Sequence, residues 1–242
     1  MSFSYKEQIC RWAWYEAPSV GSTNDEIKKW DKDKFPVILS TVEQTGGKGR
    51  RGRTWQSVNG NLYFTFSEQI RPDVLSRFVC IIGLTLAKTV KKFEPKADVK
   101  IKWPNDVFLA GKKLSGILIE NITDDLWAIG IGVNIKGAPQ IIDMPYQATS
   151  LSDNNIKTDR IEFLKAYFKQ YEKDLLTYRQ QGFGALKEEW LRLALNLNQE
   201  ITIKNDEKSQ KGVFLTLDDN GYLILKTEDK EERIIAGDLF IS

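Results

Sequence analysis

The chain has 242 residues, 41% of them hydrophobic and 11% aromatic, which is enough for one sizeable packed domain and a small second one. Its 35 basic and 33 acidic residues leave a net charge of +2, which argues against a surface devoted to nucleic acid. No segment approaches the roughly 18 apolar residues of a membrane span or resembles a secretion signal, so we expect a cytoplasmic protein without a membrane partner.

Histidine is absent, and the two cysteines, Cys10 and Cys80, do not have the spacing of metal ligands. The composition therefore excludes a Ser-His or Cys-His nucleophile, a histidine general base and a metal site built from His or Cys. Any catalysis must depend on positioning and on fixed charges.

The first part of the chain alternates strands with helices. An aromatic run at residues 11–15 predicts a strand, and Ser22-Thr23-Asn24 is an N-cap signal for a helix that reaches about Trp30. Further strands are expected at 37–42, 62–67, 99–103 and 127–135, a helix at 75–93, and a hairpin of 107–110 and 114–120 around Gly111-Lys112-Lys113. These elements predict a mixed α/β (α+β) domain with a largely antiparallel sheet.

The last part of the chain changes character. Apolar residues recur every three or four positions over 159–181 and over 183–197, which predicts two more helices. After residue 199, short alternating apolar segments around the turn dipeptide Asn220-Gly221 indicate about five strands. We expect a small β-barrel-like unit, and therefore two domains, at residues 1–195 and 196–242.

One basic loop stands out between the strands at 37–42 and 62–67. Residues 46–53, GGKGRRGR, interleave four glycines with Lys48, Arg50, Arg51 and Arg53. Glycine lets a backbone approach a ligand closely, and guanidinium groups match the oxygen pairs of carboxylates and phosphates. The pattern indicates a loop that binds an anion, although a flexible solvated loop is the alternative when such a stretch stands alone.

Other motifs accompany the basic loop. KWPND spans residues 102–106, GKKLSGILIE spans 111–120 and GIGVNI spans 130–135, while Ser22-Thr23-Asn24 and Gln44 precede the loop. Singly, these motifs are typical of a helix cap, a turn and a solvated hairpin tip. Their order and spacing, from about residue 15 to about residue 151, resemble the catalytic domain of the biotin protein ligases.

This resemblance implies a class II aminoacyl-tRNA synthetase-like catalytic domain followed by an SH3-like β-barrel. It implies an ATP-dependent ligase that makes biotinyl-5'-AMP and transfers biotin to a lysine of a biotin carboxyl carrier protein domain, such as that of acetyl-CoA carboxylase. The substrates would be ATP and biotin, with Mg²⁺. Because Ser22 lies close to Met1, we expect the monofunctional type without an N-terminal DNA-binding domain, as a monomer or homodimer.

The resemblance also implies the site residues. Biotin would be contacted by Ser22, Thr23, Asn24, Gln44, Lys48, Gly49, Arg50 and Lys113, and ATP or the adenylate by Arg50, Arg51, Arg53, Trp55, Lys102, Asn105 and Asn134. The catalytic groups would be Arg50, Lys102, Lys113 and Asp106, with Mg²⁺ near Asp106. Ser, Thr and Gln side chains suit a ureido ring, which has a carbonyl acceptor and two N–H donors. The family usually has arginine where Lys48 stands, so a ligand contact by its side chain stays open.

Two alternatives are weighed against this hypothesis. A lipoate ligase would share the fold and the adenylation chemistry, although the basic loop, KWPND and GKKLSGIL resemble the motifs of biotin ligases more closely. A module that binds single-stranded nucleic acid could also use Arg/Gly stretches with neighbouring aromatic residues. The net charge of +2 and the lack of a second basic patch argue against that module, so we expect no nucleic-acid partner.

Overall fold

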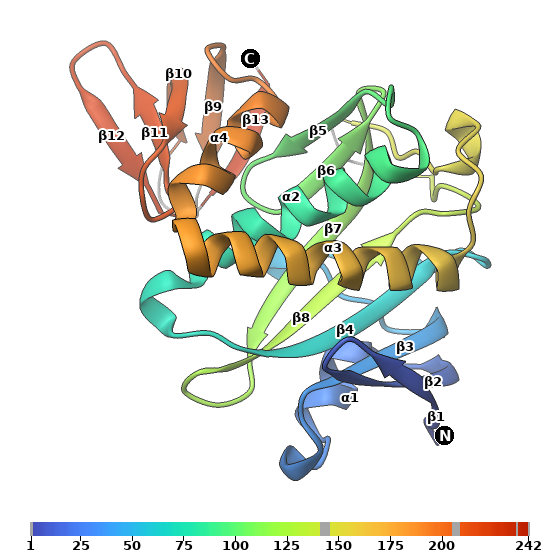
Figure 1. Cartoon of the computed structure of the whole chain (residues 1–242). Coiled ribbons are helices and arrows are strands. Elements are labelled where there is room, and N and C mark those ends of the chain that lie inside the picture. The colour runs from blue at the N-terminus through green and yellow to red at the C-terminus, as the bar shows by residue number, and fades with distance from the viewer. Residues whose placement is uncertain (1, 141–145, 205–208, 236, 242) are drawn as a thin grey trace.

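The computed structural model describes residues 2–140, 146–204, 209–235 and 237–241. The larger of its two sheets contains β1 (Ser4–Ile9), β2 (Trp12–Val20), β3 (Val37–Gln44), β4 (Leu62–Gln69), β5 (Val99–Lys102), β6 (Asp106–Leu109), β7 (Lys112–Asn121) and β8 (Leu126–Val133). The strand order is β1-β2-β3-β4-β8-β7-β6-β5, and β2 and β3 are parallel whereas the other neighbours are antiparallel (Figure 1).

The smaller sheet lies at the C-terminal end of the chain. It contains β9 (Glu200–Lys204), β10 (Ser209–Leu217), β11 (Leu223–Lys226), β12 (Glu231–Ile234) and β13 (Asp238–Ile241), in the order β12-β11-β10-β9-β13 and all antiparallel. The helices are α1 (Thr23–Lys28), α2 (Leu75–Phe93), α3 (Arg160–Gln181) and α4 (Phe183–Leu193), with 3-10 turns at Lys32–Lys34, Arg50–Gly52, Pro72–Val74 and Ser152–Asn154.

The mixed α/β architecture and most elements are confirmed, but several predicted boundaries are wrong. β1 was not predicted, and β2 continues through Pro18, which is tolerated because β1 pairs with β2 only as far as Glu16. Helix α1 ends at Lys28 rather than at Trp30. Helix α4 ends at Leu193 rather than at residue 197, because Leu195 donates its N–H to the Ile101 carbonyl and so joins the sheet.

The predicted hairpin at 107–120 has a tighter turn than expected. Ala110 and Gly111 both have positive φ, 48° and 74°, as the two central residues of a two-residue hairpin turn require. Lys112 and Lys113 therefore belong to β7 and not to the turn, so Lys113 is held by a strand rather than exposed on a solvated tip.

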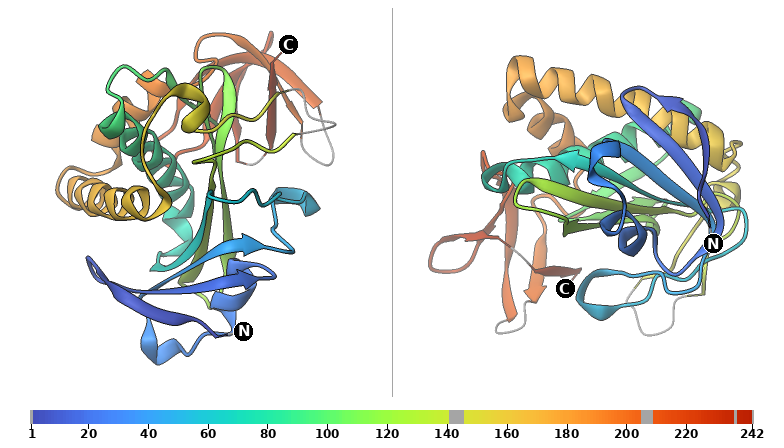
Figure 2. Two further views of the ribbon diagram at one scale, coloured as in Figure 1. Left: turned by 90° about the vertical axis from the view of Figure 1, so that its right-hand side faces the viewer. Right: turned by 90° about the horizontal axis from the view of Figure 1, so that it is seen from below.

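Alternation along the strands assigns the two faces of the large sheet. Ile38 packs in the main core with Phe64 and Ile129, whereas its neighbours on β3 pack with Ile27 of α1 on the opposite face. Helices α2 and α3 lie side by side over the first face, and α1 covers part of the second (Figures 1 and 2). The second face is therefore only partly covered by a helix. The cavity described below lies on this second face.

The C-terminal sheet contacts the large sheet's side of the chain through the predicted Asn220-Gly221 turn, which joins β10 to β11. The Asn220 carbonyl accepts a hydrogen bond from the Ser76 hydroxyl at 2.6 Å, and the Gly221 carbonyl accepts one from the Trp103 indole at 3.3 Å. Trp103 belongs to the KWPND segment, so the small sheet is attached directly behind a predicted site motif. None of the helices in the described residues combines the length and apolar character that crossing a membrane requires.

Candidate active site

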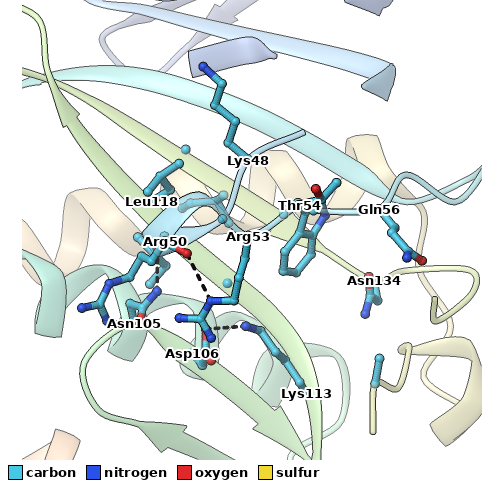
Figure 3. A pocket seen from close by; sticks show the side chains of 18 of the residues that line it. Lys48, Arg50, Arg53, Thr54, Gln56, Asn105, Asp106, Lys113, Leu118 and Asn134 are labelled. Carbon is cyan, nitrogen blue, oxygen red and sulfur yellow. Dashed lines mark hydrogen bonds and ion pairs between the residues drawn. The ribbon is translucent and has the colours of Figure 1, made fainter. Parts of the chain in front are cut away.

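A cavity of about 400 Å³ opens on the second face of the large sheet and brings the predicted motifs together (Figure 3). Every site residue predicted from the sequence lines it except Arg51: Ser22, Thr23, Asn24, Gln44, Lys48, Gly49, Arg50, Arg53, Trp55, Lys102, Asn105, Asp106, Lys113 and Asn134. These residues come from α1, β3, the basic loop, the β5–β6 turn, β7 and the end of β8. The cavity is therefore assembled from segments more than 100 positions apart in the sequence.

Three glycines of β7 and β8 line the cavity: Gly116 lies opposite Gly132, and Gly130 lies opposite Leu118. A Cβ added to Gly132 would lie 2.4 Å from the Trp55 indole, and one added to Gly130 would lie 2.1 Å from the Asn24 amide. Any larger residue at these positions would displace a cavity side chain. The glycines of GIGVNI thus provide room for Asn24 and Trp55.

One end of the cavity is polar and uncharged. Gln44 Oε1 accepts a hydrogen bond from the Thr23 backbone N–H at 2.8 Å. The same Oε1 atom lies 3.1 Å from the Thr23 hydroxyl oxygen. Ser22 is the N-cap of α1, yet its side chain makes no capping hydrogen bond, and no other described residue is hydrogen-bonded to this hydroxyl. Ser22 is nevertheless buried beside the cavity, so its hydroxyl is available to a ligand.

The other end of the cavity is cationic. Lys113 Nζ forms an ion pair with Asp106 Oδ1 at 2.7 Å, and the buried Lys102 ammonium lies 4.6 Å from the centre of the Tyr146 ring. Burial lowers the pKa of Lys102, an effect that the Asp106 charge opposes and the Lys113 charge reinforces. Burial and the nearby Asp106 charge raise the pKa of Tyr146. Two lysines and one carboxylate therefore leave a net positive charge at this end.

Arg50 lies at the mouth of the cationic end. Its guanidinium donates a hydrogen bond to Asn105 Oδ1 at 2.9 Å, and the Arg50 carbonyl accepts one from Arg53 Nε at 3.1 Å (Figure 3). Burial lowers the pKa of Arg50, against the charges of Asp238 and Asp106, which raise it. Asn105 of KWPND thus orients the arginine of the basic loop.

A single carboxylate of the C-terminal sheet meets the whole arginine cluster. Asp238 Oδ2 lies 2.8 Å from Arg53 Nη2 and 3.6 Å from Arg51 Nη1, and its Oδ1 lies 3.8 Å from Arg50 Nη1. The basic loop is therefore held by a carboxylate of the small sheet.

Arg51 does not line the cavity, so its predicted contact with ATP stays a prediction that this conformation does not support. It has a positive φ of 54°, which turns its side chain toward the C-terminal sheet, where it also reaches the Lys204 carbonyl at 3.5 Å. In this conformation Arg51 joins the loop to the small sheet.

Three other predicted residues are already engaged with protein groups. Lys48 Nζ pairs with Asp25 at 2.7 Å at the cavity edge, which raises the pKa of Lys48. The Gly49 N–H donates to the Arg53 carbonyl at 2.6 Å and closes the loop on itself. Asn134 donates to the Thr149 carbonyl at 3.0 Å and so braces the segment that follows β8.

Sequence reasoning missed several residues of the site, among them Tyr146 and Asp238 in the cavity lining and Thr65 and Glu120, which are hydrogen-bonded to Asn24. Thr65 and Glu120 were parts of predicted strands, and only the strand alternation that places them opposite Phe64 and Ile119 could have assigned them to this face. Tyr146 and Asp238 lie in stretches with no motif, so no sequence signal indicated them.

We expect Asp238→Asn to loosen the basic loop of the empty protein. The substitution removes the charge shared by three guanidinium groups, which in this partly exposed setting should cost about 1 kcal/mol of local stability, or roughly fivefold in amide exchange. Hydrogen exchange of residues 45–55 checks this expectation. Asp219→Asn is the matched control, because Asp219 also belongs to the small sheet but pairs with Lys187. Equal exchange rates in both variants and the unchanged protein would show that Asp238 does not hold the loop.

Comparison with known proteins agrees with this geometry. The model of the biotin/lipoate A/B protein ligase family matches residues 17–135, and that of the biotin protein ligase C-terminal domain matches residues 197–242. A biotin–[acetyl-CoA-carboxylase] ligase from Paracoccus denitrificans is 33% identical over 82% of this chain and 87% of its own length. The bifunctional ligase/repressor BirA of Bacillus subtilis is 32% identical over 84% of this chain, which spans 65% of that protein.

Solved structures give the same result. The biotin protein ligase from Aquifex aeolicus in complex with biotin and ATP has a TM-score of 0.83 and 28% identity, over 94% of this chain and 97% of that one. The large mixed sheet, the small antiparallel sheet and these similarities define the class of the protein as a ligase. The chain belongs to the biotin protein ligase family.

Proposed function

We propose that this chain activates biotin with ATP as biotinyl-5'-AMP and transfers the biotinyl group to a lysine of a biotin carboxyl carrier domain, such as that of an acetyl-CoA carboxylase. The observation that carries the proposal is the polarity of one continuous cavity. Its uncharged end suits a ureido ring, and its cationic end suits the carboxylate and phosphates that must meet there.

The first step joins two anions, so its main barrier is electrostatic repulsion. The biotin carboxylate attacks the α-phosphorus of ATP, and the bond to the pyrophosphate breaks. Lys102, Lys113 and Arg50 all line the cavity, and in this proposal they hold the oxygens of both partners. Preorganised charges of this kind stabilise the transition state without a protein nucleophile. A chain without histidine is sufficient for this chemistry.

The second step requires a neutral amine from the carrier. That amine attacks the acyl carbon of the adenylate, AMP leaves, and one proton is released. Asp106 is a carboxylate beside both lysines of the cationic end, and in this proposal it accepts that proton or orients the amine. Its ion pair with Lys113 keeps the two groups together.

Mg²⁺ fits this site as an ion that arrives with the substrate phosphates. Among the described residues no cluster of three or more His, Cys, Asp or Glu side chains could hold a metal by itself, and Asp106 is a carboxylate of the cavity lining near both lysines. Mg²⁺ is commonly bound by one or two carboxylates together with phosphates. Asp106 would help to hold the ion, which would supply further neutralisation of the phosphate charge.

The finer architecture is part of the same proposal. The large sheet with α1 to α4 corresponds to a class II aminoacyl-tRNA synthetase-like domain, and the small sheet to an SH3-like barrel. A boundary at residues 195/196 is supported by the end of α4 at Leu193, the start of β9 at Glu200, and the family match that begins at residue 197.

The test of the function is release of pyrophosphate from ATP that depends on biotin, followed by biotin labelling of a carrier domain at one lysine. Lipoate in place of biotin distinguishes the alternative ligase, because it lacks the two N–H donors of the ureido ring. Release that requires lipoate, or release with neither acid, would overturn the proposal.

We expect Trp55→Ala to weaken ATP binding more than biotin binding. Trp55 lies across Gly116 and Gly132, and we propose that its ring stacks on adenine. Loss of one stacked base typically costs about 1 to 3 kcal/mol. Titrations of ATP and biotin, each measured separately, check the difference. Equal losses for both ligands would make Trp55 a structural residue of the cavity.

A further inference from the structure

A chain of four hydrogen-bonded side chains begins at the polar end of the cavity, which Thr23 and Asn24 line, and includes Thr65 and Glu120, which do not line it. Asn24 Nδ2 donates to Glu120 Oε2 at 2.8 Å, while Thr65 Oγ1 lies 2.6 Å from Asn24 Oδ1 and 2.7 Å from Thr23 Oγ1. Thr65 is fully buried, and Asn24 and Thr23 are nearly so. Because these three side chains are shielded from water, we expect their hydroxyl and amide hydrogens to be donated to protein acceptors.

Glu120 fixes the orientation of the Asn24 amide. Burial opposes ionisation of Glu120, but hydrogen bonds from Lys28 and Asn24 outweigh it and lower the pKa of this carboxyl. A carboxylate only accepts, so the amide nitrogen of Asn24 must face it, and the Leu118 carbonyl at 3.3 Å requires the same orientation. The Asn24 oxygen therefore faces Thr65.

The direction of the next two hydrogens follows from this orientation. Thr65 has one hydroxyl hydrogen, and a contact of 2.6 Å to the acceptor-only Asn24 oxygen requires that Thr65 donate there. The Thr65 oxygen is then the acceptor in its 2.7 Å contact, so Thr23 donates its only hydroxyl hydrogen to Thr65.

Thr23 consequently has no hydrogen left for the cavity. Gln44 Oε1 is oriented by the Thr23 backbone N–H, so it too is an acceptor, and the two oxygens lie 3.1 Å apart. A pair of acceptors this close is complementary to a single N–H donor placed between them. The available hydroxyl of Ser22 beside them can donate to a neighbouring carbonyl.

We propose that Thr65, through Asn24 and Glu120, sets the hydrogen-bond direction that makes the Thr23–Gln44 pair select an acid whose ring carries an N–H donor next to a carbonyl. Thr65 does not line the cavity, so it is a positioning residue that acts on ligand choice. The inference rests on the proposed function, because it explains how that site distinguishes a ureido ring from a ring without donors.

The experiment compares Thr65→Val, which keeps the shape and loses the hydroxyl, with Thr65→Ser, which keeps the hydroxyl. Without the Thr65 oxygen, Thr23 donates to Gln44 Oε1 and one acceptor is lost to the ligand. We expect Thr65→Val to weaken the binding of biotin about tenfold. The binding of dethiobiotin, which keeps the ureido group, should weaken by the same factor, whereas the affinity for ATP and the kcat at saturating biotin should not change. Thr65→Ser should bind like the unchanged protein.

Thr41→Val is the matched control, because Thr41 is fully buried on the neighbouring strand and donates to the Ala17 carbonyl instead. It should leave biotin affinity unaltered. Thr65→Ala replaces Thr65→Val if the latter does not fold. The inference is overturned if the folded variant without the hydroxyl binds biotin normally, if Thr65→Ser loses as much, or if Thr41→Val does. If the unchanged protein itself fails to bind biotin, the proposed function fails instead.

Discussion

Replacing Lys113 or Lys102 with alanine should slow adenylate formation by roughly 10- to 150-fold while the protein stays folded. Each substitution removes one charge-assisted hydrogen bond to the reacting oxygens, typically about 1.5 to 3 kcal/mol. Lys113→Ala also leaves Asp106 without its partner at 2.7 Å, so its effect should lie at the upper end of the range. The measurement is the rate of biotin-dependent pyrophosphate release at saturating substrates.

Lys112→Ala provides the control for this pair. Lys112 is exposed, precedes Lys113 on β7 and does not line the cavity, so the loss of its charge should not change the rate. If Lys113→Ala and Lys102→Ala both released pyrophosphate as fast as Lys112→Ala, the two lysines would not be phosphate or carboxylate ligands.

The second large effect concerns the stability of the intermediate in the site. An acyl adenylate is a mixed anhydride that any lysine amine can attack once it leaves the enzyme. Arg50 is oriented by Asn105 at the cavity mouth and can hold the adenylate phosphate through two N–H groups. Arg50→Gly should therefore weaken retention, by about 1.5 to 3 kcal/mol, more than it weakens the chemistry.

Biotin incorporation into added albumin, relative to the carrier domain, measures this leakage. Arg51→Gly is the control, since Arg51 lies outside the cavity and its left-handed backbone conformation suits glycine. We expect albumin labelling to rise for Arg50→Gly and to stay low for Arg51→Gly. An active Arg50→Gly enzyme with an unchanged labelling ratio would show that another group guards the adenylate.

Local patterns were sufficient to predict most elements of the fold. The alternation in LYFTFS and the apolar spacing of residues 75–93 depend on neighbours in sequence, and β4 and α2 occur there. Element ends were less predictable because tertiary contacts set them. Leu195 leaves the helical conformation to pair with Ile101, a contact that no local pattern reveals.

In the site, too, local motifs were predictable from the sequence, whereas features that depend on tertiary contacts were not. The motifs gather in one cavity because each lies at a strand or helix end that the predicted sheet brings together. Asp238 could not be predicted, because it meets Arg53 across 185 positions of sequence. Arg51 could not be placed either, since its direction depends on one positive φ within a loop of similar residues.

The attachment of the small sheet bears on how enzymes of this kind can be recombined. Asp238 enters the arginine cluster and the Gly221 carbonyl binds the indole of Trp103, so both contacts link the small sheet to the cavity wall. A chimera that received this sheet from another ligase would set a different residue against its own basic loop unless the donor had an acidic residue at the position of Asp238. Exchange at the proposed 195/196 junction should therefore alter substrate binding as well as stability, and a working hybrid would need that acidic residue and a hairpin that presents a carbonyl to Trp103.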